Sequence, residues 1–211
     1  MIKNFLRIGI STRQTKYSKY NEMRDVISHD WIYFFNELNF IPILIPNTLK
    51  NIPNFLDEMK LDGIVLSGGD NIGDFPERDQ TENEIIEFSI KKNIPLIGIC
   101  RGMQIINSFF GGTIKKNATT DHVKNTHKIL FLKNNFCKIN INSINVNSFH
   151  NNLINSENLA NDLESVAMAD IDDSIEAFCH KKYPIFGIMW HPERTPDEKN
   201  KNILRNFFKL I

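Results

Sequence analysis

One cysteine, Cys100, lies where an apolar run ends and a helical pattern begins, in the segment Ile94-Pro-Leu-Ile-Gly-Ile-Cys-Arg-Gly-Met-Gln104. A strand that turns sharply into a helix presents a nucleophile at the tip of the turn. Backbone N–H groups and the positive end of the helix dipole stabilise a thiolate at that place. A buried structural cysteine is the alternative interpretation. Gly98 and Gly102 favour the turn, because glycine weakens strands and helices unless the backbone geometry requires it.

A histidine and an acid follow far downstream, in the segment Trp190-His-Pro-Glu193. The partners of a catalytic cysteine meet it in space rather than in sequence. We expect His191 to take up the thiol proton and return it to the leaving group. We expect Glu193 to orient and stabilise the imidazolium. The His-x-Glu spacing suits a turn after a strand, and the three residues together predict a Cys-His-Glu triad.

Five stretches, in this order along the chain, resemble class I glutamine amidotransferases and their stand-alone γ-glutamyl hydrolase relatives of the peptidase C26 type. They are Leu61-Asp-Gly-Ile-Val-Leu-Ser-Gly-Gly-Asp70, Arg78-Asp79 with Glu82, Gly98-Ile-Cys-Arg-Gly-Met-Gln104, Val146-Asn-Ser-Phe-His150 and Gly187-Ile-Met-Trp-His-Pro-Glu193. The resemblance implies a cysteine-dependent hydrolase that cleaves a γ-glutamyl–nitrogen bond and releases glutamate. It also implies a flavodoxin-like, mostly parallel sheet flanked by helices.

The same resemblance implies roles for residues outside the triad. The oxyanion of the tetrahedral intermediate would accept hydrogen bonds from the backbone N–H groups of Gly69 and Arg101. The residues implied to bind the glutamyl end are Gln104, Ser148, Phe149, His150, Arg78 and Glu82. For Arg78 and Glu82 the alternative is a solvated loop and helix start. For Ser67-Gly-Gly69 alone, the alternative is an ordinary turn.

One departure concerns the leaving group. The γ-glutamyl-GABA hydrolase branch has His-His-Gln where this chain has His150-Asn-Asn152. The stretches Tyr20–Asp25, Asp30-Trp31 and Ile41–Pro46 instead resemble the branch that hydrolyses γ-glutamyl-CDP-amidate for phosphoramidate modification of capsular polysaccharide. We therefore expect Arg24 on the leaving-group side, where it could meet a phosphate, with Asp25 and Trp31 as weaker candidates.

Three functions compete on these grounds. The favoured one is a stand-alone hydrolase of a small-molecule γ-glutamyl substrate with a nucleotide phosphoramidate leaving group. The alternatives are a glutaminase subunit that passes ammonia to a separate synthetase and a γ-glutamyl-GABA hydrolase. A non-enzymatic binding module would require the Cys-His-Glu set to be coincidental.

Composition excludes several classes of partner. The 211 residues include 25 Lys plus Arg and 25 Asp plus Glu, a balance without long-range attraction to nucleic acid or acidic membranes. The three cysteines, Cys100, Cys137 and Cys179, are widely spaced, which favours a reducing cytoplasm over a disulfide framework. No signal peptide or spanning segment is expected. We expect a cytoplasmic enzyme with neither nucleic-acid nor membrane partners.

Neither a metal nor a nucleotide cofactor is expected. His122 and His127 follow Asp121, but no third ligand has a sensible spacing in the sequence. Histidines at the surface or at a pocket edge are the preferred interpretation. The chain also has no Gly-x-x-x-x-Gly-Lys loop for the phosphates of ATP.

The elements expected to position these residues alternate in the first half, which predicts parallel βαβ units in an α/β fold. Strands are expected over 6–11, 41–45, 61–66, 96–99, 165–169, 175–179 and 185–189, and helices over 26–38, 47–59, 81–92, 102–110 and 196–210. Alternating residues over 129–146 predict an antiparallel portion in the second half. With no linker or internal repeat, we expect a single domain over 1–211.

Overall fold

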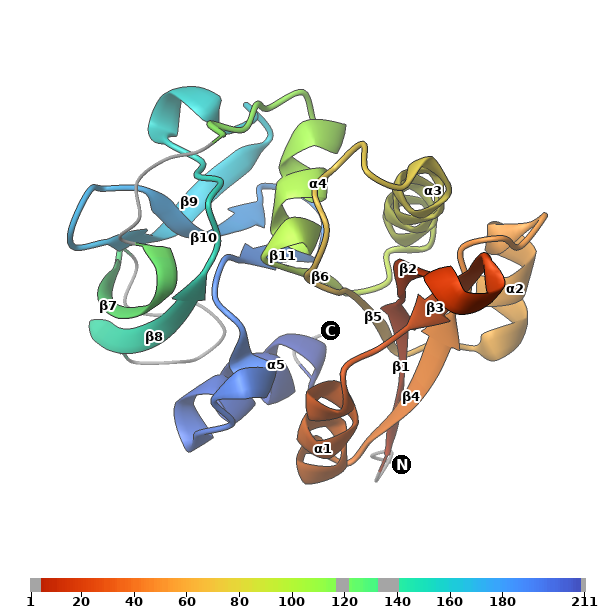
Figure 1. Ribbon diagram of the computed structural model, residues 1–211. Helices are drawn as coiled ribbons and strands as arrows, with labels where there is room; N and C mark the ends of the chain where they lie inside the picture. Colours follow the sequence, from red (N-terminus) through yellow and green to blue (C-terminus); the bar gives the residue numbers. More distant parts are fainter. Residues whose placement is uncertain (1–4, 117–121, 133–140, 210–211) are drawn as a thin grey trace.

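The computed structural model describes residues 5–116, 122–132 and 141–209. Among these residues, nine strands form one sheet in the order β4-β1-β5-β6-β11-β10-β9-β7-β8 (Figure 1). Their bounds are β1 (Leu6–Ser11), β4 (Phe40–Ile45), β5 (Gly63–Leu66), β6 (Leu96–Ile99), β7 (Val123–Phe131), β8 (Ser143–Phe149), β9 (Leu163–Ala169), β10 (Ile175–His180) and β11 (Ile185–Ile188). Asp121, Cys137 and the middle of the segment expected over 129–146 lie outside the described residues.

The sheet has a parallel part and an antiparallel part. Strands β4, β1, β5, β6 and β11 pair in parallel, and β10, β9, β7 and β8 continue the sheet by antiparallel pairing. The expected α/β fold with an added antiparallel portion is confirmed. In the parallel part the chain starts at β1, adds β4 on one side, and then adds β5, β6 and β11 on the other. The direction of strand addition therefore reverses between β1 and β5, and ligands bind beyond the carboxyl ends of strands at such a point.

Helices cover both faces of the parallel strands (Figure 1). The helices α1 (His29–Leu38) and α5 (Glu198–Lys209) lie on one face, and α2 (Ile52–Met59), α3 (Pro76–Lys92) and α4 (Arg101–Phe109) lie on the other. Every residue of β5, β6 and β11 is buried, as expected for parallel strands covered on both faces. The ends of these three strands are therefore rigid supports for a site.

The segment before α1 differs from the sequence-based expectation. A helix was expected from Val26, but α1 begins at His29, where the Asp30 N–H donates to the Ser28 side chain as a helix cap. The preceding residues form a hairpin of β2 (Arg13–Tyr17), the 3₁₀ turn η1 (Ser18–Tyr20) and β3 (Glu22–Val26). The apolar face of α1 is buried as expected, through Trp31, Phe34, Phe35 and Leu38.

Three further helix starts were expected at the wrong residue. Helix α2 begins at Ile52 rather than at 47, because the Asn51 side chain accepts from the Asn54 N–H at 3.0 Å. Helix α3 begins at Pro76 rather than at 81, since proline is favoured in the first turn. Helix α5 begins at Glu198 rather than at 196.

Candidate active site

Cys100 lies in a strained turn between β6 and α4, with φ of 51° and ψ of −102°. Residues with a side chain rarely adopt such a backbone conformation. A Cβ atom at Gly98 would lie 2.4 Å from the carbonyl carbon of Gly102, and one at Gly102 would lie 2.2 Å from the carbonyl oxygen of Leu66. The glycines are therefore required by the close approach of the backbones, and the strand–cysteine–helix turn expected from the sequence is confirmed.

The structure brings together the three residues expected to form a triad. His191 follows β11, the parallel neighbour of β6, and Glu193 lies in the short 3₁₀ turn η5 (Pro192–Arg194). The Nδ1 atom of His191 lies 2.7 Å from Oε1 of Glu193. His191 forms its other side-chain interaction with Cys100. All three side chains are buried. The turn after β11 therefore brings His191 and Glu193 next to Cys100, although they are far from it in the sequence.

The charges of this group favour an ion pair. Burial would lower the pKa of His191, but hydrogen bonding with Cys100 and Glu193 and the charges of both raise it to about 9. Burial would raise the pKa of Cys100, yet hydrogen bonding with His191 and the positive charges of His191 and His150 bring it below its usual value. The two shifts favour a thiolate beside an imidazolium at neutral pH.

Asn147 of β8 anchors His191 from the antiparallel part of the sheet. Its Oδ1 accepts from the His191 N–H at 2.9 Å, and its Nδ2 donates to the His191 carbonyl at 2.7 Å. Its Nδ2 also donates to Oγ1 of Thr195 at 2.9 Å. The sequence analysis did not single out Asn147, although it stands inside the segment 146–150 that carries the family resemblance.

The loop after β5 passes directly beside the histidine. A Cβ atom at Gly68 would lie 2.7 Å from Cε1 of His191, and Gly69 has φ of +130°, which favours glycine. The guanidinium of Arg78 donates to the carbonyl oxygens of Ser67 at 2.8 Å and Gly68 at 3.1 Å. The loop is therefore fixed in place. The backbone N–H groups of Gly69 and Arg101 remain the predicted oxyanion donors, and that of Arg101 has no acceptor within its own helix.

Arg78 and Glu82 lie in a buried cluster of charges behind this loop. Nε of Arg78 donates to Oε1 of Glu82 at 3.0 Å, and the Arg101 side chain pairs with Glu82 and Asp79. Neither Arg78 nor Glu82 is exposed, so the alternative of a solvated loop and helix start is wrong. Their contact with a substrate stays a prediction, whereas their contacts in the structure position the loop and α4.

Of the other residues implied to bind the glutamyl end, Gln104 lies one helical turn after Cys100 and Phe149 lies near His191. Gln104 is buried, and its Oε1 accepts from Nδ2 of Asn152 at 3.2 Å. The Phe149 ring is 40% exposed and lies 6.0 Å from the His191 ring. The Ser148 hydroxyl donates to the carbonyl of His122 at 2.7 Å, and Ser148 is fully buried in the β7–β8 ladder. Substrate binding by these residues stays a prediction.

Three histidines from two segments, 122–127 and the end of β8, lie near one buried acid, Glu176 of β10. Nε2 of His127 and Nε2 of His150 each lie 3.5 Å from a Glu176 oxygen. Burial would raise the pKa of Glu176, but these histidines lower it to about 2. The ligand atoms of His122, His127 and Glu176 lie within 4.8 Å of one another. The sequence analysis found no third side chain for a metal because Glu176 comes from a distant strand; that no metal is needed stays a prediction.

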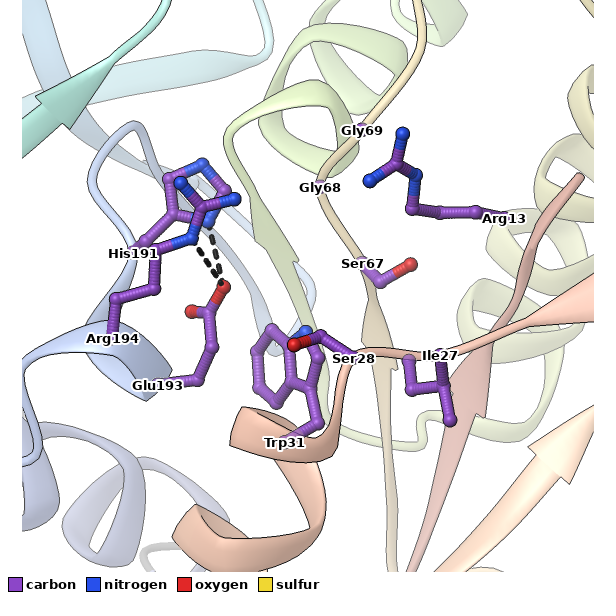
Figure 2. Close-up of a pocket in the computed structure, with 10 residues that line it drawn as sticks. All are labelled: Arg13, Ile27, Ser28, Trp31, Ser67, Gly68, Gly69, His191, Glu193 and Arg194. Atoms are coloured by element: carbon purple, nitrogen blue, oxygen red, sulfur yellow. Dashed lines mark hydrogen bonds and ion pairs between the residues drawn. The ribbon is translucent and has the colours of Figure 1, made fainter. Parts of the chain in front are cut away.

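A small open hollow of about 30 Å³ lies beside the triad. It is lined by Arg13, Ile27, Ser28, Trp31, Ser67, Gly68, Gly69, His191, Glu193 and Arg194 (Figure 2). Figure 2 shows Arg13 and Arg194 on opposite sides of the hollow, with Trp31 below. The hollow thus lies at the carboxyl ends of β1 and β5, the point where the direction of strand addition reverses.

Trp31, a weaker candidate for the leaving-group side, lines this hollow, but Arg24 and Asp25 do not. Arg24 lies on the β2–β3 hairpin, where it pairs with Glu22 at 2.8 Å and stacks on the Tyr17 ring at 4.1 Å. Asp25 accepts from the backbone and side chain of Asn47 at 2.9 and 2.7 Å. A substrate role for Arg24 stays a prediction.

Arg13 and Arg194 were missed by the sequence analysis. Two signals could have identified them: Arg13 follows the first strand after one intervening residue, and Arg194 directly follows the Trp190–Glu193 segment. Within the described ranges, every helix is too short or too polar to span a lipid bilayer.

Comparisons with known proteins show similarity to one family over nearly the whole chain. The Peptidase C26 family model matches residues 7–193. The chain is 35% identical to a γ-glutamyl-CDP-amidate hydrolase of Campylobacter jejuni, over 97% of this chain and 98% of that protein. It is 32% identical to a glutamine-hydrolyzing GMP synthase subunit of Pyrococcus furiosus, over 79% of this chain and 84% of that protein.

Two solved structures have a similar fold. A putative GMP synthase subunit of Thermoplasma acidophilum superposes with a TM-score of 0.76 at 25% identity, covering 97% of this chain and 93% of that chain. A glutamine amidotransferase of Thermotoga maritima superposes with a TM-score of 0.67 at 17% identity, covering 97% of both chains.

Proposed function

Because the chain belongs to the peptidase C26 family, we propose that it is a cysteine-dependent hydrolase that cleaves a γ-glutamyl–nitrogen bond through Cys100, His191 and Glu193. The observation that carries the proposal is the continuous contact from the strained Cys100 turn through His191 to Glu193. A nucleophile, a base within reach and a third group that orients the base form the expected arrangement for covalent catalysis.

The proposed reaction has two stages. The Cys100 thiolate attacks the δ carbon of the γ-glutamyl group, and the resulting oxyanion accepts hydrogen bonds from the N–H groups of Gly69 and Arg101. The carbon–nitrogen bond then breaks, and His191 gives its proton to the leaving nitrogen. Water, deprotonated by His191, attacks the thioester; glutamate leaves and the proton returns to the Cys100–His191 pair.

The proposed substrate is γ-glutamyl-CDP-amidate, whose hydrolysis gives glutamate and cytidine diphosphoramidate for modification of capsular polysaccharide. The support is the Campylobacter jejuni relative, which matches almost the whole length of both chains. The replacement of His-Gln by Asn151-Asn152 also separates this chain from the GABA branch. We keep the predictions of a single domain over 1–211, a cytoplasmic location, and the absence of nucleic-acid and membrane partners.

A glutaminase subunit is the second candidate function, since one GMP synthase subunit is 32% identical and another shares the fold at 25% identity. In that case glutamine would be the substrate, and ammonia would pass to a separate synthetase. A γ-glutamyl-GABA hydrolase is the third.

The test compares kcat/KM of the purified chain for γ-glutamyl-CDP-amidate, glutamine and γ-glutamyl-GABA. We expect the phosphoramidate to be the best substrate, because contacts to a large leaving group add to transition-state binding. A preference for glutamine would instead indicate an ammonia-donating subunit. Cys100→Ala protein is the control, because residual turnover in that variant would come from a contaminating enzyme.

A further inference from the structure

We propose that the open side of the hollow beside His191 binds the phosphates of the leaving group, between the guanidinium groups of Arg13 and Arg194. The inference rests on the proposed function, which supplies the direction of the substrate. His191 must reach the leaving nitrogen to give it a proton, and His191 lines the hollow. A leaving group whose nitrogen lies at His191 therefore lies next to the hollow.

The Arg13 side chain is fixed in position at one side of the hollow. Its guanidinium donates through NH2 to Oδ1 of Asp70 at 3.0 Å. The side chain also lies across Gly69, where an added Cβ atom would come within 2.5 Å of Nε. Because Asp70 also pairs with Arg78 at 3.3 Å, it is fixed from both sides and in turn fixes Arg13. With 45% of the side chain exposed, other guanidinium N–H groups remain accessible.

Arg194 is held at the opposite side by different contacts (Figure 2). Its guanidinium carbon lies 4.5 Å from the centre of the Phe149 ring, and Nε lies 3.9 Å from Oε1 of Glu193. A guanidinium stacked on an aromatic face directs its N–H groups outward in its own plane. The Arg194 side chain is 39% exposed, so these donors can meet a ligand.

Two positioned guanidinium groups favour phosphate over other ligands. Their planar forks match two oxygens of a phosphate, and such charge-assisted bonds are stronger than neutral ones. Each arginine is oriented by a neighbouring carboxylate, Asp70 or Glu193, and keeps donors for an anion. Ammonia as the leaving group would make no use of either arginine. The hollow thus favours a diphosphate leaving group over glutamine hydrolysis.

The first test measures binding of inorganic diphosphate to Cys100→Ala protein by calorimetry at constant ionic strength. We expect Arg13→Ala and Arg194→Ala to weaken binding by roughly tenfold each, the loss expected for a charge-assisted hydrogen bond. The diphosphate affinities of the Arg13→Lys and Arg194→Lys variants should lie between those of the parent protein and the alanine variants, because lysine keeps the positive charge but lacks the planar pair of donors. Arg205→Ala is the matched control, since Arg205 lies on α5 and pairs with Glu198 outside the hollow.

The second test measures the ratio of kcat/KM for γ-glutamyl-CDP-amidate to that for glutamine, which we expect to fall about tenfold in each alanine variant. An unchanged ratio, no diphosphate binding to Cys100→Ala protein, or equally tight binding when Arg13→Ala and Arg194→Ala are both added, overturns the inference. Circular dichroism identifies a misfolded variant. If an alanine variant is misfolded, the diphosphate affinity and the kcat/KM ratio of the matching lysine variant test the inference instead. A chain that does not hydrolyse γ-glutamyl-CDP-amidate refutes the proposed substrate, whereas diphosphate binding through Arg13 and Arg194 would still support the subsite.

Discussion

Replacing Asn147 with alanine tests whether the antiparallel strands hold the catalytic histidine in place. The change removes the partners of the His191 N–H and carbonyl, at 2.9 and 2.7 Å, inside a buried site. A buried backbone group left without a partner costs about 1–3 kcal/mol, so two such groups predict a loss of about 2–6 kcal/mol in the free energy of unfolding. We expect a value near the lower end, about 3 kcal/mol, where water reaches the vacated space.

The same variant should lose activity, because His191 would no longer be fixed relative to Cys100. A displacement of about 1 Å in a catalytic group reduces turnover by roughly 100-fold. The assays are urea unfolding at pH 7 and hydrolysis of γ-glutamyl-p-nitroanilide. Asn145→Ala is the control, since Asn145 is an exposed residue of the same strand and should change stability by less than about 0.5 kcal/mol. Equal stability of the two variants, or full kcat in Asn147→Ala, would refute the reasoning.

Four further outcomes are expected. Cys100→Ala should abolish turnover while circular dichroism stays unchanged; a rate within about threefold of wild type refutes the covalent mechanism. His191→Ala should lose more kcat than Glu193→Gln, because the orienting acid is the least costly member to remove, and the reverse order would exchange their roles. The profile of kcat/KM against pH should fall above about 9, where His191 loses its proton, and again below the lowered pKa of Cys100, where the thiolate is protonated; a profile that keeps rising past pH 10 contradicts the ion pair. Glu176 has a folded pKa of about 2 against 4.5 in the unfolded chain, so its stabilisation is present above pH 4.5 and disappears as the pH falls through 2. Glu176→Gln should therefore destabilise the protein at pH 7 in urea unfolding, and a difference from wild type that does not shrink below about pH 4.5 contradicts this assignment.

The parallel part of the fold could be predicted because its strands are short apolar runs, of which β5, β6 and β11 are buried throughout. The β2–β3 hairpin could not, since most residues of both strands are exposed and show no apolar alternation. The start of α3 was missed for a related reason. Its first turn, beginning Pro76-Glu-Arg78, carries no apolar residue, although Arg78 is fully buried through its charged partners.

The candidate triad was recognisable because Cys100 stands in one motif at a strand end, and His191 and Glu193 stand together in another. Asn147, Glu176, Arg13 and Arg194 have no comparable motif that indicates their role, and Arg13 and Arg194 are marked only by their positions after such segments. Their importance comes from neighbours in space: Asn147 reaches His191 from β8, and Glu176 reaches His150 from β10. Pairing between distant strands creates these contacts, and a single sequence does not contain the register of that pairing.

The β2–β3 hairpin has a consequence for how specificity can change in this fold. It forms a two-stranded sheet of its own, and its ladder shares no hydrogen-bonded strand with the nine-stranded sheet. Insertions or deletions at its tip, around η1, would leave the register of β1, β5 and β6 intact. The strands that hold the proposed nucleophile and oxyanion donors would therefore keep their positions when the hairpin changes. A library of variants with different β2–β3 hairpin lengths would thus change the surface next to Arg13 and leave Cys100, His191 and Glu193 in place.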